Sequence, residues 1–240
     1  MKYYAHSKPG EPAEDWQPLE EHLANVAELS AKFASSFESK YWAHNAAWLH
    51  DLGKADSAFQ GYLMRENGLD DSDYDSGRIN HSSAGAAFSE EKLGQLAGRV
   101  LAYLSAGHHA GLPDWHSTDT ANAALSIRLN EGKENLSSIR PYSELLFKQL
   151  HSILRPPLFV KPENFHFWMR FIYSCLVDAD FLDTESFMDS KQAEHRAKFA
   201  KLSELKTEFY GYMGAFADSA EMAGRRAHPP YNPIRDPTRL

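Results

Sequence analysis

The sequence has very little cysteine and no long apolar run. Cys175 is the single cysteine of the 240 residues, so no internal disulfide can form, and its apolar surroundings favour a buried thiol. No segment approaches the roughly 18 consecutive apolar residues of a membrane-crossing helix. The N-terminal Met-Lys-Tyr-Tyr-Ala-His-Ser also lacks the apolar centre of a signal peptide. These absences predict a cytoplasmic protein without a membrane span.

Excess positive charge and a phosphate-binding loop are missing as well. The formal net charge is -8, whereas domains that coat nucleic acid by bulk electrostatics are usually strongly basic. A nuclease in which bound cations supply positive charge at one point is still compatible with this charge. The pattern Gly-x-x-x-x-Gly-Lys-Ser/Thr does not occur, so the chain contains no recognisable ATPase site.

The apolar pattern predicts an all-α fold. Apolar residues from Leu19 to Phe37 recur at steps of three and four, which is typical of a helix with one buried face. A short helix is expected over residues 42–49, with Gly53 as its C-terminal stop, and another around Phe59 to Leu63. No segment alternates apolar and polar residues for long enough to indicate a strand. The other expected helices cover residues 81–89, 93–107, 118–130, 141–154, 163–183 and 189–217.

Two segments have the composition of irregular structure. Residues 66–80 are acidic and contain glycine and serine, which predicts a loop. The last twenty residues carry four prolines and four arginines, which is typical of an extended tail or a linker. We therefore expect one domain over residues 1–220 and a tail or linker over residues 221–240.

Twelve histidines are the most informative feature of the composition. His50 and Asp51 are adjacent, and neighbouring side chains on a helix point about 100° apart. The pair can therefore bind different sides of a metal cluster, with the Asp51 carboxylate free to bridge two ions. On its own, such a pair is equally typical of a protein surface or a helix terminus.

Other histidines are ambiguous when each is considered alone. His22 lies on the apolar face of its helix, where a histidine is more often a core residue than a ligand. His81 precedes the small-residue segment Ser-Ser-Ala-Gly-Ala-Ala, which would let a helix pack tightly against a site, and it fits a helix cap or a ligand. His108 and His109 stand where a helix gives way to a loop, which also suits a solvated loop end.

Two carboxylates lie near the end of a helix that is otherwise apolar. Asp178 or Asp180 must be paired, protonated or metal-bound if it is buried, because isolated burial of a charge is too costly. Periodicity does not decide between them, and the other residue fits a cap or a salt bridge. Imidazole and carboxylate ligands without thiolates suit Mn, Fe, Co, Ni or Zn better than a structural zinc site. Mg²⁺ is less suited because it prefers oxygen ligands.

In combination, these motifs resemble the HD hydrolase superfamily. More narrowly, the chain is similar to the HD nuclease domain of the signature helicase-nuclease of type I CRISPR interference systems. The matching blocks are residues 4–7, 16–23, 50–54 with Phe59, Tyr62 and Leu63, 81–86, 108–114 and 176–185.

The resemblance implies a compact helical bundle with a central metal site that cleaves single-stranded DNA. Asp180 is preferred to Asp178 because the superfamily pattern is a small residue, Asp, two further residues and Asp, as in 179–183. The expected partners are single-stranded DNA, a helicase domain or subunit outside this chain, and a type I surveillance complex. By the same resemblance, one or two divalent cations would be held by His22, His50, Asp51, His81, His108, His109 and Asp180.

Two residues are expected to take part in phosphodiester hydrolysis. Asp51 would bridge the cations, and Lys54 would neutralise charge on the phosphate in the transition state. Lys54 fits a solvated lysine at a helix end equally well. Trp115 and His116 offer stacking surfaces for an unpaired base, although an aromatic that covers the core is the simpler interpretation.

Two other functions remain open at this point. An HD phosphohydrolase that acts on nucleotides or other small phosphoesters would share the metal ligands and differ in the shape of its cleft. A non-catalytic adaptor would be expected to lack a ligand, and no candidate ligand is missing from this sequence.

Overall fold

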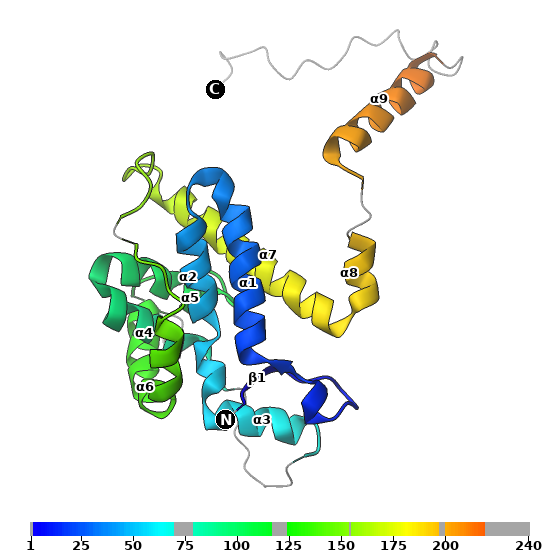
Figure 1. The fold of residues 1–240 in the computed structure, drawn as a ribbon. Helices are drawn as coiled ribbons and strands as arrows, with labels where there is room; N and C mark the ends of the chain where they lie inside the picture. The colour runs from blue at the N-terminus through cyan, green and yellow to red at the C-terminus, as the bar shows by residue number, and fades with distance from the viewer. Residues whose placement is uncertain (1, 70–78, 117–123, 154, 197–199, 219–240) are drawn as a thin grey trace. The chain divides into compact units, whose positions relative to one another are not determined.

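The computed structural model describes residues 2–69, 79–116, 124–153, 155–196 and 200–218 (Figure 1). The chain divides into two units, residues 1–193 and 194–240. Every candidate site residue belongs to the first unit, which is therefore described by itself.

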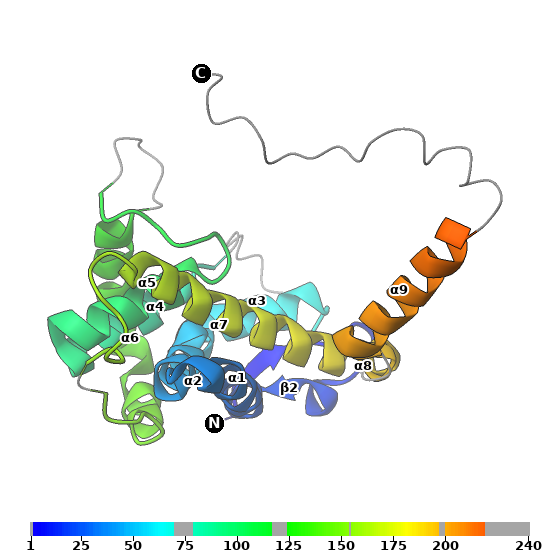
Figure 2. The ribbon, with the colours of Figure 1, turned by 90° about the horizontal axis from the view of Figure 1, so that it is seen from above.

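The described residues are mainly helical, which confirms the predicted all-α class (Figures 1 and 2). Two very short strands pair antiparallel at the start of the chain. Short 3-10 turns cover residues 13–15, 35–37 and 52–55, and a π-helical turn covers residues 94–98. The main elements are β1 Tyr4–His6, β2 Gln17–Pro18, α1 Leu19–Ala34, α2 Lys40–His50, α3 Ser57–Glu66, α4 Ser82–Leu93, α5 Arg99–Gly107, α6 Leu125–Phe147, α7 Phe165–Met188, α8 Ser190–Arg196 and α9 Leu202–Asp218.

Helix α2 lies at the centre of the first unit, where it contacts α1, α4, α5 and α7. Residues from Trp42 to His50 are buried almost without interruption, as expected for a helix that other helices enclose. Its alanines at 43, 46 and 47 leave room for the neighbouring helices to approach. Because α2 ends at His50, the His50-Asp51 pair lies in the interior of the unit.

Helices α1 and α7 pack against each other and against α2. The predicted apolar face of α1 is buried, and His22 lies on that face between Leu19 and Val26. On α7, the buried positions Ile172, Leu176, Ala179 and Asp183 recur at steps of three and four. The packing of these two faces therefore brings the aspartates of α7 to His22.

The small residues of α4 allow the close packing that the sequence predicts. All residues from Ser82 to Ser89 are buried. A Cβ atom on Gly85 would overlap the backbone carbonyl of Leu49 on α2, so only glycine fits this approach. His81 stands at the N-terminus of α4 and is brought close to the end of α2.

Three predicted boundaries are wrong. Residues 125–147 form the single helix α6, which includes Pro141, instead of separate helices at 118–130 and 141–154. Its buried positions recur at helical spacing through the polar stretch, because α6 packs along α4. Residues 118–123 lie outside the described part. The helix expected over 189–217 is observed as α8 and α9, and residues 197–199 between them are not described.

Gly53 also has a different role from the predicted helix stop. The helix ends at His50, with Asp51 as its C-cap. Gly53 lies in the following 3-10 turn, where a Cβ atom would overlap the backbone carbonyl of His81. Its small size therefore allows the turn after Asp51 to approach the residue that begins α4.

The remaining expectations concern the predicted loop and tail, the single cysteine and a membrane span. Most of the predicted acidic loop, residues 70–78, and the predicted tail, residues 221–240, lie outside the described residues. Cys175 is half-buried, and burial raises the pKa of its thiol to about 11. Among the described helices, none combines the length and the apolar character needed to cross a membrane.

Candidate metal centre

Asp51 lies at the centre of a group of imidazoles, and its side chain is 1% exposed. Its Oδ2 atom is 3.4 Å from Nε2 of His22 and 3.4 Å from Nε2 of His50. Its Oδ1 atom is 3.3 Å from Nε2 of His81 and 3.3 Å from Nε2 of His108. The two carboxylate oxygens thus divide four imidazoles into two pairs.

Asp180 completes the pair formed by His22 and His50. Its Oδ1 atom lies 3.3 Å from Nε2 of His22 and 3.6 Å from Nε2 of His50. Asp178, the other candidate, is exposed. The helical turn of α7 therefore places Asp180, rather than Asp178, beside the imidazoles.

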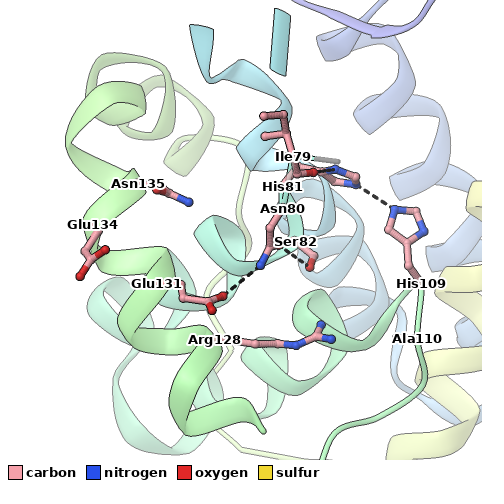
Figure 3. A pocket seen from close by; sticks show the side chains of 10 residues that line it. All are labelled: Ile79, Asn80, His81, Ser82, His109, Ala110, Arg128, Glu131, Glu134 and Asn135. Carbon is pink, nitrogen blue, oxygen red and sulfur yellow. Dashed lines mark hydrogen bonds between the residues drawn. The ribbon is translucent and has the colours of Figure 1, made fainter. Parts of the chain in front are cut away.

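His109 joins the pair formed by His81 and His108 and lies at the exposed side of the centre. Its Nε2 atom is 2.8 Å from Nε2 of His81, and a dashed line joins the two side chains in Figure 3. Asp51, His81, His108 and His109 each offer a ligand atom within 4.8 Å of the others. All seven residues predicted as ligands therefore lie in one cluster.

The second ring nitrogen of His50 and of His108 is held by the backbone of its own helix. Nδ1 of His50 is 2.6 Å from the carbonyl oxygen of Ala47, and Nδ1 of His108 is 2.7 Å from that of Ser105. Because a carbonyl only accepts, Nδ1 must carry the proton in both rings. Each Nε2 lone pair is therefore directed at the centre, the arrangement that metal-binding histidines commonly show.

His22 is oriented by a carboxylate instead. Its Nδ1 atom lies 2.7 Å from Oδ2 of Asp183, so Nε2 is the atom that faces the centre. Gln17 donates to the same Asp183 oxygen at 2.8 Å, and Asn25 donates to Oδ1 at 2.8 Å. Asp183 is thus a fixed hydrogen-bond acceptor that holds the His22 ring in place.

The buried acceptors of the centre lack donors. Within the described residues, no hydrogen-bond partner is found for Nε2 of His22, His50 and His108 or for Oδ1 of Asp51. An unsatisfied buried polar group costs about 1–3 kcal/mol. A divalent cation would satisfy all of these atoms together, and a mixed nitrogen and oxygen donor set suits a transition metal. The residues present therefore fit a divalent cation.

The charges of the centre shift its pKa values strongly. Burial opposes ionisation of Asp51, but Lys54 and His50 outweigh it and hold the pKa of this carboxyl well below its usual range. Nζ of Lys54 is buried and lies 2.7 Å from Oδ2 of Asp51. Burial lowers the pKa of His22, but the carboxylates of Asp180, Asp183 and Asp51 around its ring outweigh this and raise it to about 10.

The sequence did not single out three residues of this region: Asp183, Gln17 and His6. In the sequence, Asp183 was noted only as the last residue of a superfamily pattern. Its spacing from Asp180 nevertheless puts both residues on one helix face. Gln17 gave no signal of its own. His6 lies in a matching block, and one of its ring nitrogens is within 4.8 Å of ligand atoms of His22, Asp51 and Asp180. Burial lowers the pKa of His6 to about 3, so its ring is neutral.

The two aromatic candidates for base stacking lie on the α5 and α6 side of the unit. Trp115 packs against a buried cluster that includes Ala102 and Leu125. The guanidinium of Arg99 lies 4.0 Å from the centre of its ring. His116 is exposed, and its ring centre is 5.8 Å from that of Trp115. Trp115 therefore covers the core, the simpler of the two interpretations.

A cavity of about 580 Å³ lies beside the centre, with His81 and His109 on its wall (Figure 3). Asn80 donates to Glu131 at 3.1 Å and to Ser83 at 2.8 Å across this wall. Arg128 donates to the carbonyl oxygen of Ala106. The full lining is Ile79, Asn80, His81, Ser82, His109, Ala110, Arg128, Glu131, Glu134 and Asn135.

A helical unit with a His-Asp pair at the end of its central helix, enclosed by further histidines and an aspartate, defines a metal-dependent hydrolase of the HD type. Residues 5–155 match the family described as "Cas3, HD domain", and the chain belongs to this family. The resemblance found in the sequence is thereby confirmed at the level of the family.

Comparison with solved structures gives one further finding. A chain described as "Crystal structure of CRISPR-associated protein" shares 19% sequence identity with a TM-score of 0.43. The match covers 75% of this chain and 22% of that chain, so this chain spans less than a quarter of the length of its relative. The comparison with curated proteins found no match.

Proposed function

We propose that this chain is a metal-dependent nuclease that hydrolyses phosphodiester bonds in single-stranded DNA during CRISPR interference. The family membership supports the CRISPR context and the hydrolase class. The observation that carries the proposal is the position of Asp51, whose two oxygens each face a pair of imidazoles. This is the arrangement expected of a carboxylate shared by two cations.

The proposed centre holds one or two divalent ions. Mn, Ni, Co, Fe and Zn suit its imidazole-rich ligand set better than Mg. When bound, such ions supply Lewis-acid polarisation of a phosphodiester and activate water near neutral pH. The proposed ligands are His22, His50, Asp51, His81, His108, His109 and Asp180.

Two residues are proposed to act beyond simple ligation. Asp51 bridges the two halves of the centre and fixes their spacing. Lys54 keeps Asp51 ionised through the 2.7 Å ion pair and adds positive charge where phosphate charge builds up. Asp183 positions His22 through its hydrogen bond.

The substrate and the partners follow from the family rather than from a visible contact. Single-stranded DNA would reach the centre from the side of His81 and His109, where the cavity opens. A helicase domain or subunit and a type I surveillance complex would supply that strand in the cytoplasm. We assign the nuclease domain to residues 1–220 and a tail or linker to residues 221–240.

A small phosphoester is the second candidate substrate. A cavity of about 580 Å³ lies within the range that holds small ligands. An HD phosphohydrolase with this centre would turn over free nucleotides and leave circular single-stranded DNA intact.

The test is a nicking assay on circular single-stranded DNA with the full chain, run separately with Mn²⁺, Ni²⁺, Co²⁺ and Mg²⁺. We expect the transition metals to support cleavage and His50→Ala or Asp51→Ala to abolish it while circular dichroism shows a folded protein. His166→Ala, which removes an exposed histidine of α7, is the matched control and should cleave normally. Cleavage that persists in both His50→Ala and Asp51→Ala would refute the proposal, and turnover of nucleotides alone would favour the phosphohydrolase.

A further inference from the structure

The N-terminal strand β1 places the imidazole of His6 beside the candidate metal centre. The ring of His6 lies edge-on to that of His22, with ring centres 4.8 Å apart. One of its nitrogens falls within 4.8 Å of ligand atoms of His22, Asp51 and Asp180. These four residues come from β1, α1, the end of α2 and α7, so they surround one point from several elements.

Strand β1 is tied to the same part of the unit that carries the centre. The backbone N–H of Tyr4 donates to Oε1 of Gln60 at 3.0 Å, and Nε2 of Gln60 donates to the Tyr4 carbonyl at 2.9 Å. Nε2 of Gln60 also donates to the carbonyl of Lys54 at 2.6 Å. His6 pairs with Gln17 of β2, whose side chain donates to Asp183. Strand β1 is therefore connected by hydrogen bonds to two residues beside the centre. Gln60 links it to Lys54, and Gln17 links it to Asp183.

One nitrogen of the His6 ring is available to bind a metal ion. Within the described part of the chain, its hydrogen-bond partner is the hydroxyl of Thr184, 3.3 Å from Nε2. An imidazole has two ring nitrogens, and one such contact leaves a nitrogen available. The neighbouring Nε2 of His22 is buried and lacks a hydrogen-bond partner among the described residues. A cation at this point would be bound by both imidazoles.

We infer that His6 is a further ligand of the cation held by His22, Asp51 and Asp180, in addition to the seven ligands proposed above. The inference rests on the proposed metal centre and extends it. An added imidazole increases the nitrogen content of one side of the centre, which favours Co²⁺ and Ni²⁺ over Mg²⁺. His6 is thus expected to contribute to the choice of metal as well as to its affinity.

The experiment measures binding of Co²⁺ and of Mg²⁺ to the metal-stripped full chain by isothermal titration calorimetry. Loss of a group that only orients a ligand already weakens metal binding about 10–100-fold, so His6→Ala should weaken Co²⁺ binding at least about 10-fold. Binding of Mg²⁺ should change much less. His166→Ala loses an exposed histidine of the same unit and should bind both ions as the wild type does.

A second variant separates ligation from packing. His6→Phe keeps a ring against His22 but offers no donor, so it should lose Co²⁺ affinity as His6→Ala does, while its thermal unfolding in EDTA matches that of the wild type. The visible absorption spectrum of the bound Co²⁺ should also change in both variants, because a nitrogen ligand is lost. Wild-type Co²⁺ affinity and spectrum in His6→Phe would overturn the inference.

The outcomes distinguish this inference from the proposed function. If the wild type cleaves DNA, His50→Ala is inactive and both His6 variants bind Co²⁺ normally, only the role of His6 is overturned. If the wild type binds no Co²⁺, the metal centre and the role of His6 are overturned together.

Discussion

The metal centre has a buried half and an exposed half, and the two are built differently. His22 and His50 are fully buried, and each has its Nδ1 atom held at 2.6–2.7 Å by a carboxylate or a carbonyl. His81 and His109 line an open cavity, and Nδ1 of His81 is 3.4 Å from its nearest carbonyl, that of Ile79. The buried half is therefore held rigidly by helices, whereas the exposed half adjoins the space that a substrate would enter.

This difference has an energetic consequence. Rigid, buried acceptors without donors destabilise the metal-free protein, because each unsatisfied group costs about 1–3 kcal/mol. A cation that binds only the folded state recovers this free energy and raises the apparent stability. Metal binding and folding should therefore be coupled mainly through the buried half.

Asp51 joins the two halves, and its replacement should have the largest effect. Asp51→Asn removes the negative charge that faces four imidazoles, so we expect bound metal and DNA cleavage to fall below detection. Metal content after dialysis and the nicking assay check this. Asp178→Asn, which changes an exposed carboxylate of α7, should match the wild type. Normal metal content in Asp51→Asn would show that the carboxylate is not shared.

The adjacent histidines of the doublet compare a buried and an exposed ligand within the half that faces Oδ1 of Asp51. His108 is buried and fixed to Ser105, whereas His109 is exposed. We expect His108→Ala to weaken Mn²⁺ binding about 100-fold and His109→Ala about 10-fold, the upper and lower ends of the range for damaged metal sites. Calorimetric titration with Mn²⁺ measures both. Equal losses would mean that burial does not set the contribution of a ligand here.

Replacement of Asp183 tests how the His22 ring is held in the buried half, because it leaves every proposed ligand in place. Asp183→Asn keeps the shape of the side chain but weakens its hold on the His22 proton, so metal affinity should fall about 10-fold. The fold should be unaffected, as judged by circular dichroism. An unchanged affinity would indicate that Gln17 and the surrounding packing hold His22 without the charge.

The smallest predicted effect is a dependence of metal-free stability on pH. Burial lowers the pKa of His6 and of His81 to about 3. The unfolded chain therefore binds more protons than the folded one below pH 6.5, and stability should fall as the pH drops from there. The pKa of His22 is raised to about 10, so its contribution is present below pH 6.5 and is lost as the pH rises towards 10. The thermal unfolding temperature in EDTA should thus be highest near pH 6.5. A steady rise of this temperature from pH 5 to 9 would contradict the prediction.

Much of the fold and of the centre was predictable because it follows from local sequence patterns. The apolar face of α1 and the small residues of α4 gave the packing of the helices correctly. The His50-Asp51 pair and the His108-His109 doublet were each ambiguous alone, and their combination with the other motifs, together with the family resemblance, indicated metal chemistry. The wrong boundaries of α6 arose because Pro141 and the polar residues before it indicate a break, whereas packing against α4 keeps the helix continuous.

The supporting residues were not predictable from local pattern. The role of Asp183 depends on α1 packing against α7, a contact between segments about 160 residues apart. Strand β1 has three residues, too few for a periodic signal, and the matching block 4–7 did not by itself place His6 near His22. In both cases, tertiary contacts determine the function of a side chain whose neighbours in sequence say little.

The most direct test of the account is anomalous diffraction from crystals of the chain soaked in Mn²⁺. We predict a peak on each side of Asp51, one near Oδ2 with His22, His50 and Asp180 and one near Oδ1 with His81 and His108. The absence of any peak at coordination distance from Asp51 would contradict the account.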